Sequence, residues 1–130
     1  MTRETVRVAV VGAGRTGAPL IEALLEIPYI EVVGVADHDV GSPGARFAQQ
    51  HGVFFTKYAD VLAAKAQEID LIIDVTGDPE LKPALREAFR VQGNRETVIV
   101  PELVARVILS LARGLDELSP SLHPSDHQRG

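Results

Sequence analysis

The chain has 130 residues, of which 45% are hydrophobic, enough to bury a single core in one domain. It contains no cysteine, which excludes disulfides, thiolate catalysis and cysteine-ligated metal. The formal net charge of −5 comes with no basic run for nucleic-acid phosphates, and no apolar stretch is long enough to cross a bilayer, so neither nucleic acid nor membrane is an expected partner.

Apolar runs alternate along the chain with helical patterns, and short loops rich in Gly, Pro and Asp separate them. The apolar runs predict strands at 6–11, 30–36, 53–56, 70–75 and 97–100. The helical patterns predict helices at 15–26, 44–51, 59–66, 80–91 and 102–118. This alternation predicts an α/β fold, a Rossmann-like doubly wound parallel sheet forming a single domain over residues 1–118. Residues 119–130, SPSLHPSDHQRG, predict a disordered tail.

The turn after the first strand reads GAGRTG, from Gly12 to Gly17. Gly12 would allow the tight turn, Gly14 would let the backbone approach a pyrophosphate, and Gly17 would let the new helix pack closely on the sheet. The helix start would add unpaired N–H groups and a positive dipole end, with Arg15 and Thr16 beside the phosphates. The alternatives are that the glycines only make a tight strand–helix turn and that Arg15 is exposed to solvent.

Asp37 follows the second strand, twenty residues beyond Gly17. A carboxylate at this position can accept hydrogen bonds from both hydroxyls of the adenosine ribose and would repel the 2′-phosphate of NADP. The pattern therefore predicts NAD as the cofactor, with NADP less favoured. His38 and Arg15 could offset this repulsion by supplying a cation. The alternative is that Asp37 is a polar residue that only starts a loop.

The turn after the fourth strand carries a second group of candidate residues. A glycine at position 77 would let the backbone approach a cofactor, and the Thr76 hydroxyl could reach a ribose or phosphate oxygen. The alternative is that Gly77 only makes the turn and Asp78 caps the next helix. Asp74 is expected to hydrogen-bond a loop or backbone donors near the sheet edge, because burying a free carboxylate is costly.

Other polar residues give weaker signals. No two histidines are spaced as metal ligands on one element, so no metal is expected, and Lys82 is expected to be a solvated surface residue. The helix at 102–118 has an apolar stripe wide enough to need burial on more than one side. This helix predicts a homodimer contact or a partner domain. The N-terminal sequence lacks a signal peptide pattern, so a cytoplasmic location is expected.

Three segments, VRVAVVGAGRTG, EVVGVADHD and IDLIIDVTGDPEL, resemble the N-terminal domain of the Gfo/Idh/MocA oxidoreductases. Homoserine dehydrogenase, dihydrodipicolinate reductase and the Rossmann-type modules of some bacterial sensor kinases are similar, and the resemblance covers residues 5–100. It implies that Gly12, Gly14, Gly17 and Asp37 bind the cofactor, with Arg15, Thr76 and Gly77 near it.

Two departures from that family matter. The family carries an E-K-P segment after the fifth strand, whereas this chain has no lysine between Ile99 and Glu102. The substrate-binding domain that the resemblance implies is absent from these residues. The sequence therefore favours an NAD(H)-binding module that reports redox state. The alternatives are an oxidoreductase whose substrate site another subunit completes, and a CoA- or nucleotide-sensing module, although Asp37 would repel the 3′-phosphate of CoA.

Overall fold

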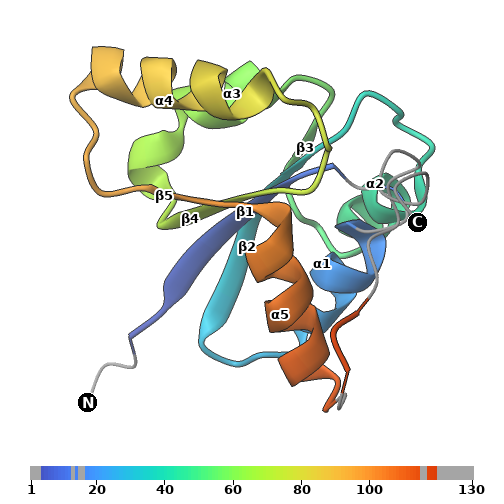
Figure 1. Cartoon of the computed structure of the whole chain (residues 1–130). Helices are drawn as coiled ribbons and strands as arrows, with labels where there is room; N and C mark the ends of the chain where they lie inside the picture. Colours follow the sequence, from blue (N-terminus) through green and yellow to red (C-terminus); the bar gives the residue numbers. More distant parts are fainter. Residues whose placement is uncertain (1–3, 13, 15–16, 115–116, 120–130) are drawn as a thin grey trace.

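The computed structural model describes residues 4–12, 14, 17–114 and 117–119. The elements are β1 (Val6–Val11), α1 (Gly17–Leu25), β2 (Ile30–Ala36), α2 (Pro43–Gln50), β3 (Phe55–Thr56), α3 (Ala59–Ala64), the 3₁₀ turn η1 (Ala66–Glu68), β4 (Leu71–Asp74), α4 (Leu81–Gln92), β5 (Val98–Val100) and α5 (Glu102–Ala112). Within the described part of the chain the strands form one parallel sheet in the order β3-β2-β1-β4-β5. This confirms the predicted α/β, Rossmann-like doubly wound fold (Figure 1).

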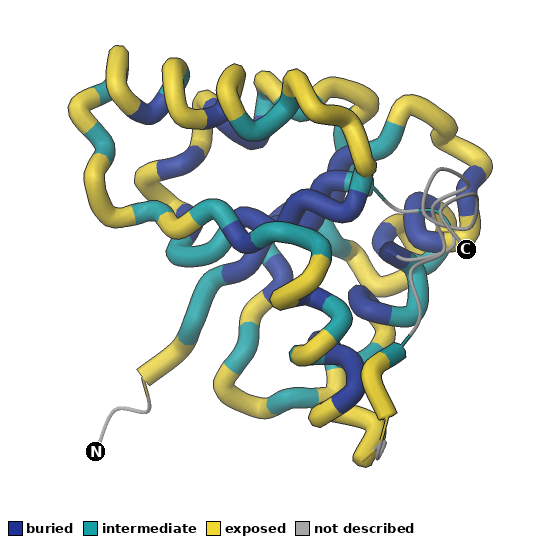
Figure 2. The backbone as a smooth tube through the Cα atoms, in the orientation of Figure 1, coloured by how far each residue is buried: buried dark blue, intermediate teal, exposed yellow. Residues whose placement is uncertain are grey.

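Helices cover both faces of the sheet, because the central strands are apolar on both sides. Val8 and Val10 of β1 belong to a core cluster that includes residues of α1, α2 and α5. Ala9 and Val11, which point the other way, belong to a cluster formed with α3 and α4. Figure 2 shows the buried residues concentrated along the sheet, with exposed residues on the outer surfaces of the helices. The two clusters pack on opposite faces of β1 and hold it at the centre of the fold, and this positions the turn that follows it.

Arg7 and Asp70 connect β1 to the start of β4 at the amino-end edge of the sheet. The Arg7 backbone N–H donates to Asp70 Oδ2 over 2.8 Å, and its guanidinium donates to both carboxylate oxygens over 3.2–3.3 Å. The guanidinium hydrogen bonds, followed by the backbone one, lower the pKa of the Asp70 carboxyl. Both side chains are about 40% exposed, so this ion pair adds little stability and serves mainly to set strand register.

The last helix is shorter than the predicted 102–118. It ends at Ala112, because Gly114 adopts a left-handed φ of 65° and reverses the chain. The Ser119 N–H then donates to Ser110 Oγ over 2.7 Å, and Arg106 Nε donates to the Ser119 carbonyl over 2.8 Å. Ser119, the first residue of the predicted tail, is therefore hydrogen-bonded back onto α5. The rest of that tail, residues 120–130, lies outside the described residues.

Smaller boundary differences have local causes. The expected third strand shortens to Phe55–Thr56, because the Val53 N–H donates to Ala48 O of the preceding helix. The expected helix at 59–66 ends at Ala64 and passes into η1. The remaining helices and strands lie within two residues of their expected bounds wherever those bounds are described. Among the described residues, no helix combines the length and hydropathy needed to span a membrane.

Candidate functional site

Gly12 sits in the turn between β1 and α1, held between the carboxyl ends of two neighbouring strands. Its N–H donates to Ala36 O at the end of β2 over 2.8 Å. Its φ of 100° lies in the range that favours glycine, and an added Cβ would lie 3.1–3.2 Å from backbone atoms of Val75 and Thr76. The tight turn predicted at Gly12 is therefore present, and packing on both sides explains why the residue is glycine.

The other two glycines of the motif have opposite surroundings. A Cβ on Gly17 would lie 1.7 Å from the carbonyl oxygen of Gly12, so the start of α1 is packed directly on the turn. Among the described residues, which do not include positions 13, 15 and 16, no atom lies within 4 Å of a Cβ on Gly14. Packing of the described residues therefore explains Gly12 and Gly17 but not Gly14. Arg15 and Thr16 lie outside the described residues.

Asp37 lies at the same edge of the sheet as the glycine turn. It follows β2 directly, and the last residues of β1 and β2, Val11 and Ala36, are paired. Asp37 Oδ1 accepts the Asp39 N–H over 2.8 Å, and the Asp37 N–H donates to Thr56 O over 3.1 Å. His38 is exposed beside it. The fold thus brings the Gly12 turn and Asp37 to adjacent strand ends, as the dinucleotide interpretation requires.

A chain of short hydrogen bonds organises the turn after β4. Asp74 Oδ1 accepts the Thr76 N–H over 2.9 Å and the Thr76 hydroxyl over 2.7 Å. The Thr76 Oγ1 accepts the Asp78 N–H over 3.0 Å, and Gly77 has a φ of 74°. The expectation that local donors satisfy Asp74 is confirmed. Because the Thr76 proton is committed to Asp74, the hydroxyl oxygen can accept a further hydrogen bond, but its O–H is not available to donate one.

A cavity of about 250 Å³ opens at this edge, between the β4–α4 turn and the start of α5. It is lined by Asp74, Gly77, Asp78, Pro79, Lys82 and Glu102. Sequence reasoning missed the roles of Lys82 and Glu102 and treated Lys82 as a solvated surface residue. Lys82 is only partly exposed and lies in the cavity wall. The positions of these two residues could have given the signal, because Lys82 lies in the first turn of α4 and Glu102 follows β5 after Pro101.

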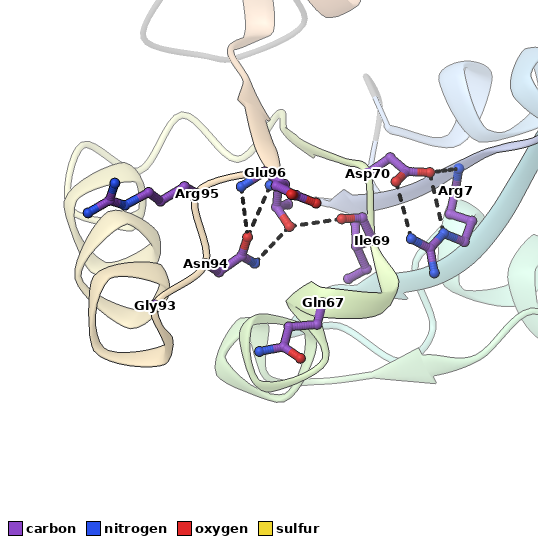
Figure 3. Close-up of a pocket in the computed structure, with 9 residues that line it drawn as sticks. Arg7, Gln67, Ile69, Asp70, Gly93, Asn94, Arg95 and Glu96 are labelled. Atoms are coloured by element: carbon purple, nitrogen blue, oxygen red, sulfur yellow. Dashed lines mark hydrogen bonds and ion pairs between the residues drawn. The ribbon is translucent and has the colours of Figure 1, made fainter.

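A second cavity, of about 450 Å³, lies at the opposite, amino-end edge of the sheet (Figure 3). Four of its polar side chains are paired with one another: Arg7 bonds Asp70, and Asn94 Nδ2 donates to Thr97 Oγ1 over 2.8 Å (Figure 3). Open α/β sheets bind ligands at the carboxyl ends of their strands, so we assign this cavity no cofactor role. Within the described ranges, no three His, Cys, Asp or Glu side chains are grouped to hold a metal ion.

Comparison with known proteins supports the fold. No protein-family model matches the chain, and no characterised protein matches it in sequence. Among solved structures, GenD2 from gentamicin A biosynthesis, in complex with NAD, superposes with a TM-score of 0.59 and 22% identity, over 87% of this chain and 33% of GenD2. A myo-inositol dehydrogenase from Corynebacterium glutamicum gives a TM-score of 0.56 and 22% identity, over 85% of this chain and 33% of its own.

A third structure, scyllo-inositol dehydrogenase from Lactobacillus casei with bound NAD(H) and scyllo-inositol, gives a TM-score of 0.55 and 14% identity. The match covers 86% of this chain and 35% of that protein. The chain therefore spans about a third of the length of the solved structures that it resembles. At these identities the shared property is the Rossmann-like fold.

Proposed function

We propose that the chain binds a nicotinamide dinucleotide, NAD(H) in preference to NADP(H), at the carboxyl edge of its sheet. The pyrophosphate would lie on the turn from Gly12 to Gly17, including Arg15 and Thr16, with the adenosine ribose at Asp37 beside His38. The observation that carries the proposal concerns Gly14: no described residue lies within 4 Å of its Cβ position, whereas packing requires the glycines at 12 and 17. The bound NAD in two of the structures with this fold supports the same cofactor class.

The nicotinamide half would extend to the other side of β1, over the ends of β4 and β5. There Thr76 and Gly77 border the crevice, because Gly12 packs against the Val75–Thr76 backbone. We further propose that the chain acts as a cofactor-binding, redox-reporting module in the cytoplasm. The segment after β5 supports this reading, because it presents Pro101 and Glu102 and no lysine.

Replacing Asp37 tests the ribose contact. In calorimetric titrations, Asp37→Ala should weaken NADH binding at least about tenfold, since hydrogen bonds to charged groups contribute about 1.5–3 kcal/mol. The same substitution should reduce the ratio of NADH affinity to NADPH affinity. Asp37→Asn keeps an acceptor for the Asp39 N–H. It therefore removes the charge of residue 37 without removing the hydrogen bond within the loop. Glu31→Gln, near the start of the same strand, is the matched control and should bind normally.

Two outcomes would favour the alternatives. If the parent chain binds NADH, NADPH and CoA equally well, the site is a general nucleotide-sensing site and not a specific dinucleotide site. NADH oxidation above background with any of a panel of small carbonyl compounds would replace the reporting module with an oxidoreductase.

The outer face of α5 supports a contact with another polypeptide surface. Leu103 and Leu111 are 58% and 75% exposed, and Val104 and Val107 lie between them on the same face. The opposite face, with Ala105 and Leu109, is already buried against the core. We propose that the exposed face packs on a second copy of the chain or on a further domain.

Sedimentation measures this contact directly. A self-associating chain should show a concentration-dependent mass that Leu111→Glu abolishes, while Val91→Glu, an exposed apolar position on α4, leaves it unchanged. A monomer at all concentrations would exclude the second copy and leave the further domain.

A further inference from the structure

The cavity after β4 lies where the topology directs the nicotinamide end of the proposed ligand. Strand β1 is flanked by β2 on one side and β4 on the other. A dinucleotide centred on the Gly12 turn, with its adenosine at the end of β2, must place its other half over β4 and β5. Asp74 and Gly77 at the end of β4 and Glu102 beyond β5 line the cavity found there. This inference rests on the proposed function.

The charges in the cavity wall are unequal. Among the described residues that line it, three carboxylate groups, those of Asp74, Asp78 and Glu102, share the wall with one amine, that of Lys82. Asp74 is 7% exposed and its Oδ1 is bonded to Thr76, so its position is fixed. The Asp78 carboxylate accepts the Glu80 N–H over 2.9 Å, which holds it in the turn. The described part of the lining therefore carries more negative than positive side chains.

The two redox forms of the cofactor differ in charge at the ring that would meet this wall. The oxidised nicotinamide ring carries a positive charge, whereas the dihydronicotinamide ring is neutral. The carboxamide, common to both, can donate its N–H groups to a carboxylate and accept from the Lys82 amine. A fixed negative wall lowers the energy of the cationic ring alone, and it does so more strongly in a partly enclosed cavity than in bulk water.

We propose that this cavity makes the chain select the oxidised dinucleotide, with Asp78 and Glu102 favouring the cationic ring and Lys82 opposing that preference. Occupancy would then follow the ratio of oxidised to reduced cofactor, because the two forms compete for one crevice. No electron or proton transfer to the protein is needed. A module with this property reports redox state through differential affinity alone.

Calorimetric titration of the whole chain with NAD⁺, NADH and ADP-ribose tests the proposal. The parent should bind NAD⁺ about tenfold more tightly than NADH, a difference of about 1.4 kcal/mol in binding free energy. Asp78→Asn, which keeps an acceptor for the Glu80 N–H, and Glu102→Gln should each reduce this ratio about threefold. Lys82→Gln should increase it by a similar factor. High salt should move every ratio toward one.

Matched controls lie at the opposite edge of the sheet. Glu96→Gln and Arg95→Gln remove one charge each near the start of β5, at the amino-end cavity, and should leave the ratio unchanged. ADP-ribose lacks the nicotinamide ring, so its affinity should be nearly the same in all five variants. A variant that loses ADP-ribose binding has lost its fold or its crevice. The remaining charge variants then test the role of the cavity.

The outcomes separate the two proposals. If the parent binds none of the three ligands, the dinucleotide function itself is wrong. If it binds ADP-ribose but takes NADH as tightly as NAD⁺ or more tightly, the redox selection is overturned and the function stands. A preference for NAD⁺ that Asp78→Asn, Glu102→Gln and Lys82→Gln all leave unchanged also overturns the role of the cavity.

Discussion

Gly17→Ala should lower the free energy of unfolding by about 3 kcal/mol, the largest stability effect expected from a single methyl group in this chain. Helix propensity alone predicts the opposite sign, since alanine is favoured over glycine inside a helix by up to about 1 kcal/mol. Packing decides the outcome, because the new Cβ would lie 1.7 Å from the Gly12 carbonyl oxygen and 2.7 Å from its carbon. These are backbone atoms, so relief requires moving the turn or the helix start.

Urea unfolding followed by circular dichroism measures this loss as a lower midpoint at unchanged slope. A domain of this size has about 5–15 kcal/mol of stability, so the variant should remain folded in the absence of urea. A variant as stable as the parent would show that α1 does not pack on the Gly12 turn as described.

Gly14→Ala should have the reverse effects of Gly17→Ala: little change in stability and the largest loss of NADH affinity. No atom of the described part of the chain lies within 4 Å of the added Cβ, so stability should change by less than about 1 kcal/mol. The methyl group would instead occupy the space proposed for the pyrophosphate. Displacing two charge-assisted hydrogen bonds should weaken NADH binding about a hundredfold.

The pair of alanine variants is internally controlled, since the chemical change is identical and the two positions share one turn. Calorimetry with ADP-ribose and NADH measures affinity, and urea unfolding measures stability. Normal NADH affinity in Gly14→Ala would place the pyrophosphate elsewhere and remove the main support for the proposed function.

Several features could be read from the residues alone because short-range patterns determine them. The continuous apolar run Val8–Val11 indicates a strand buried on both faces, and strand–helix alternation then leaves few topologies besides a right-handed parallel sheet. The spacing of Gly12, Gly14 and Gly17 specified a turn that only certain backbone geometries satisfy. Asp74 could be assigned local partners because an unpaired buried carboxylate is too costly to keep.

Tertiary packing decided the rest, because it joins segments that no local pattern connects. The sequence assigned α5 six more residues than it has, since its apolar stripe continues to Leu115, but Gly114 reverses the chain and Ser119 bonds back to Ser110. Lys82 and Glu102 are twenty positions apart and look like surface residues until β4 and β5 lie side by side. The sequence thus determined the fold and the glycine turn, whose causes are local, while the charged cavity and the exposed face of α5 arise only from long-range packing.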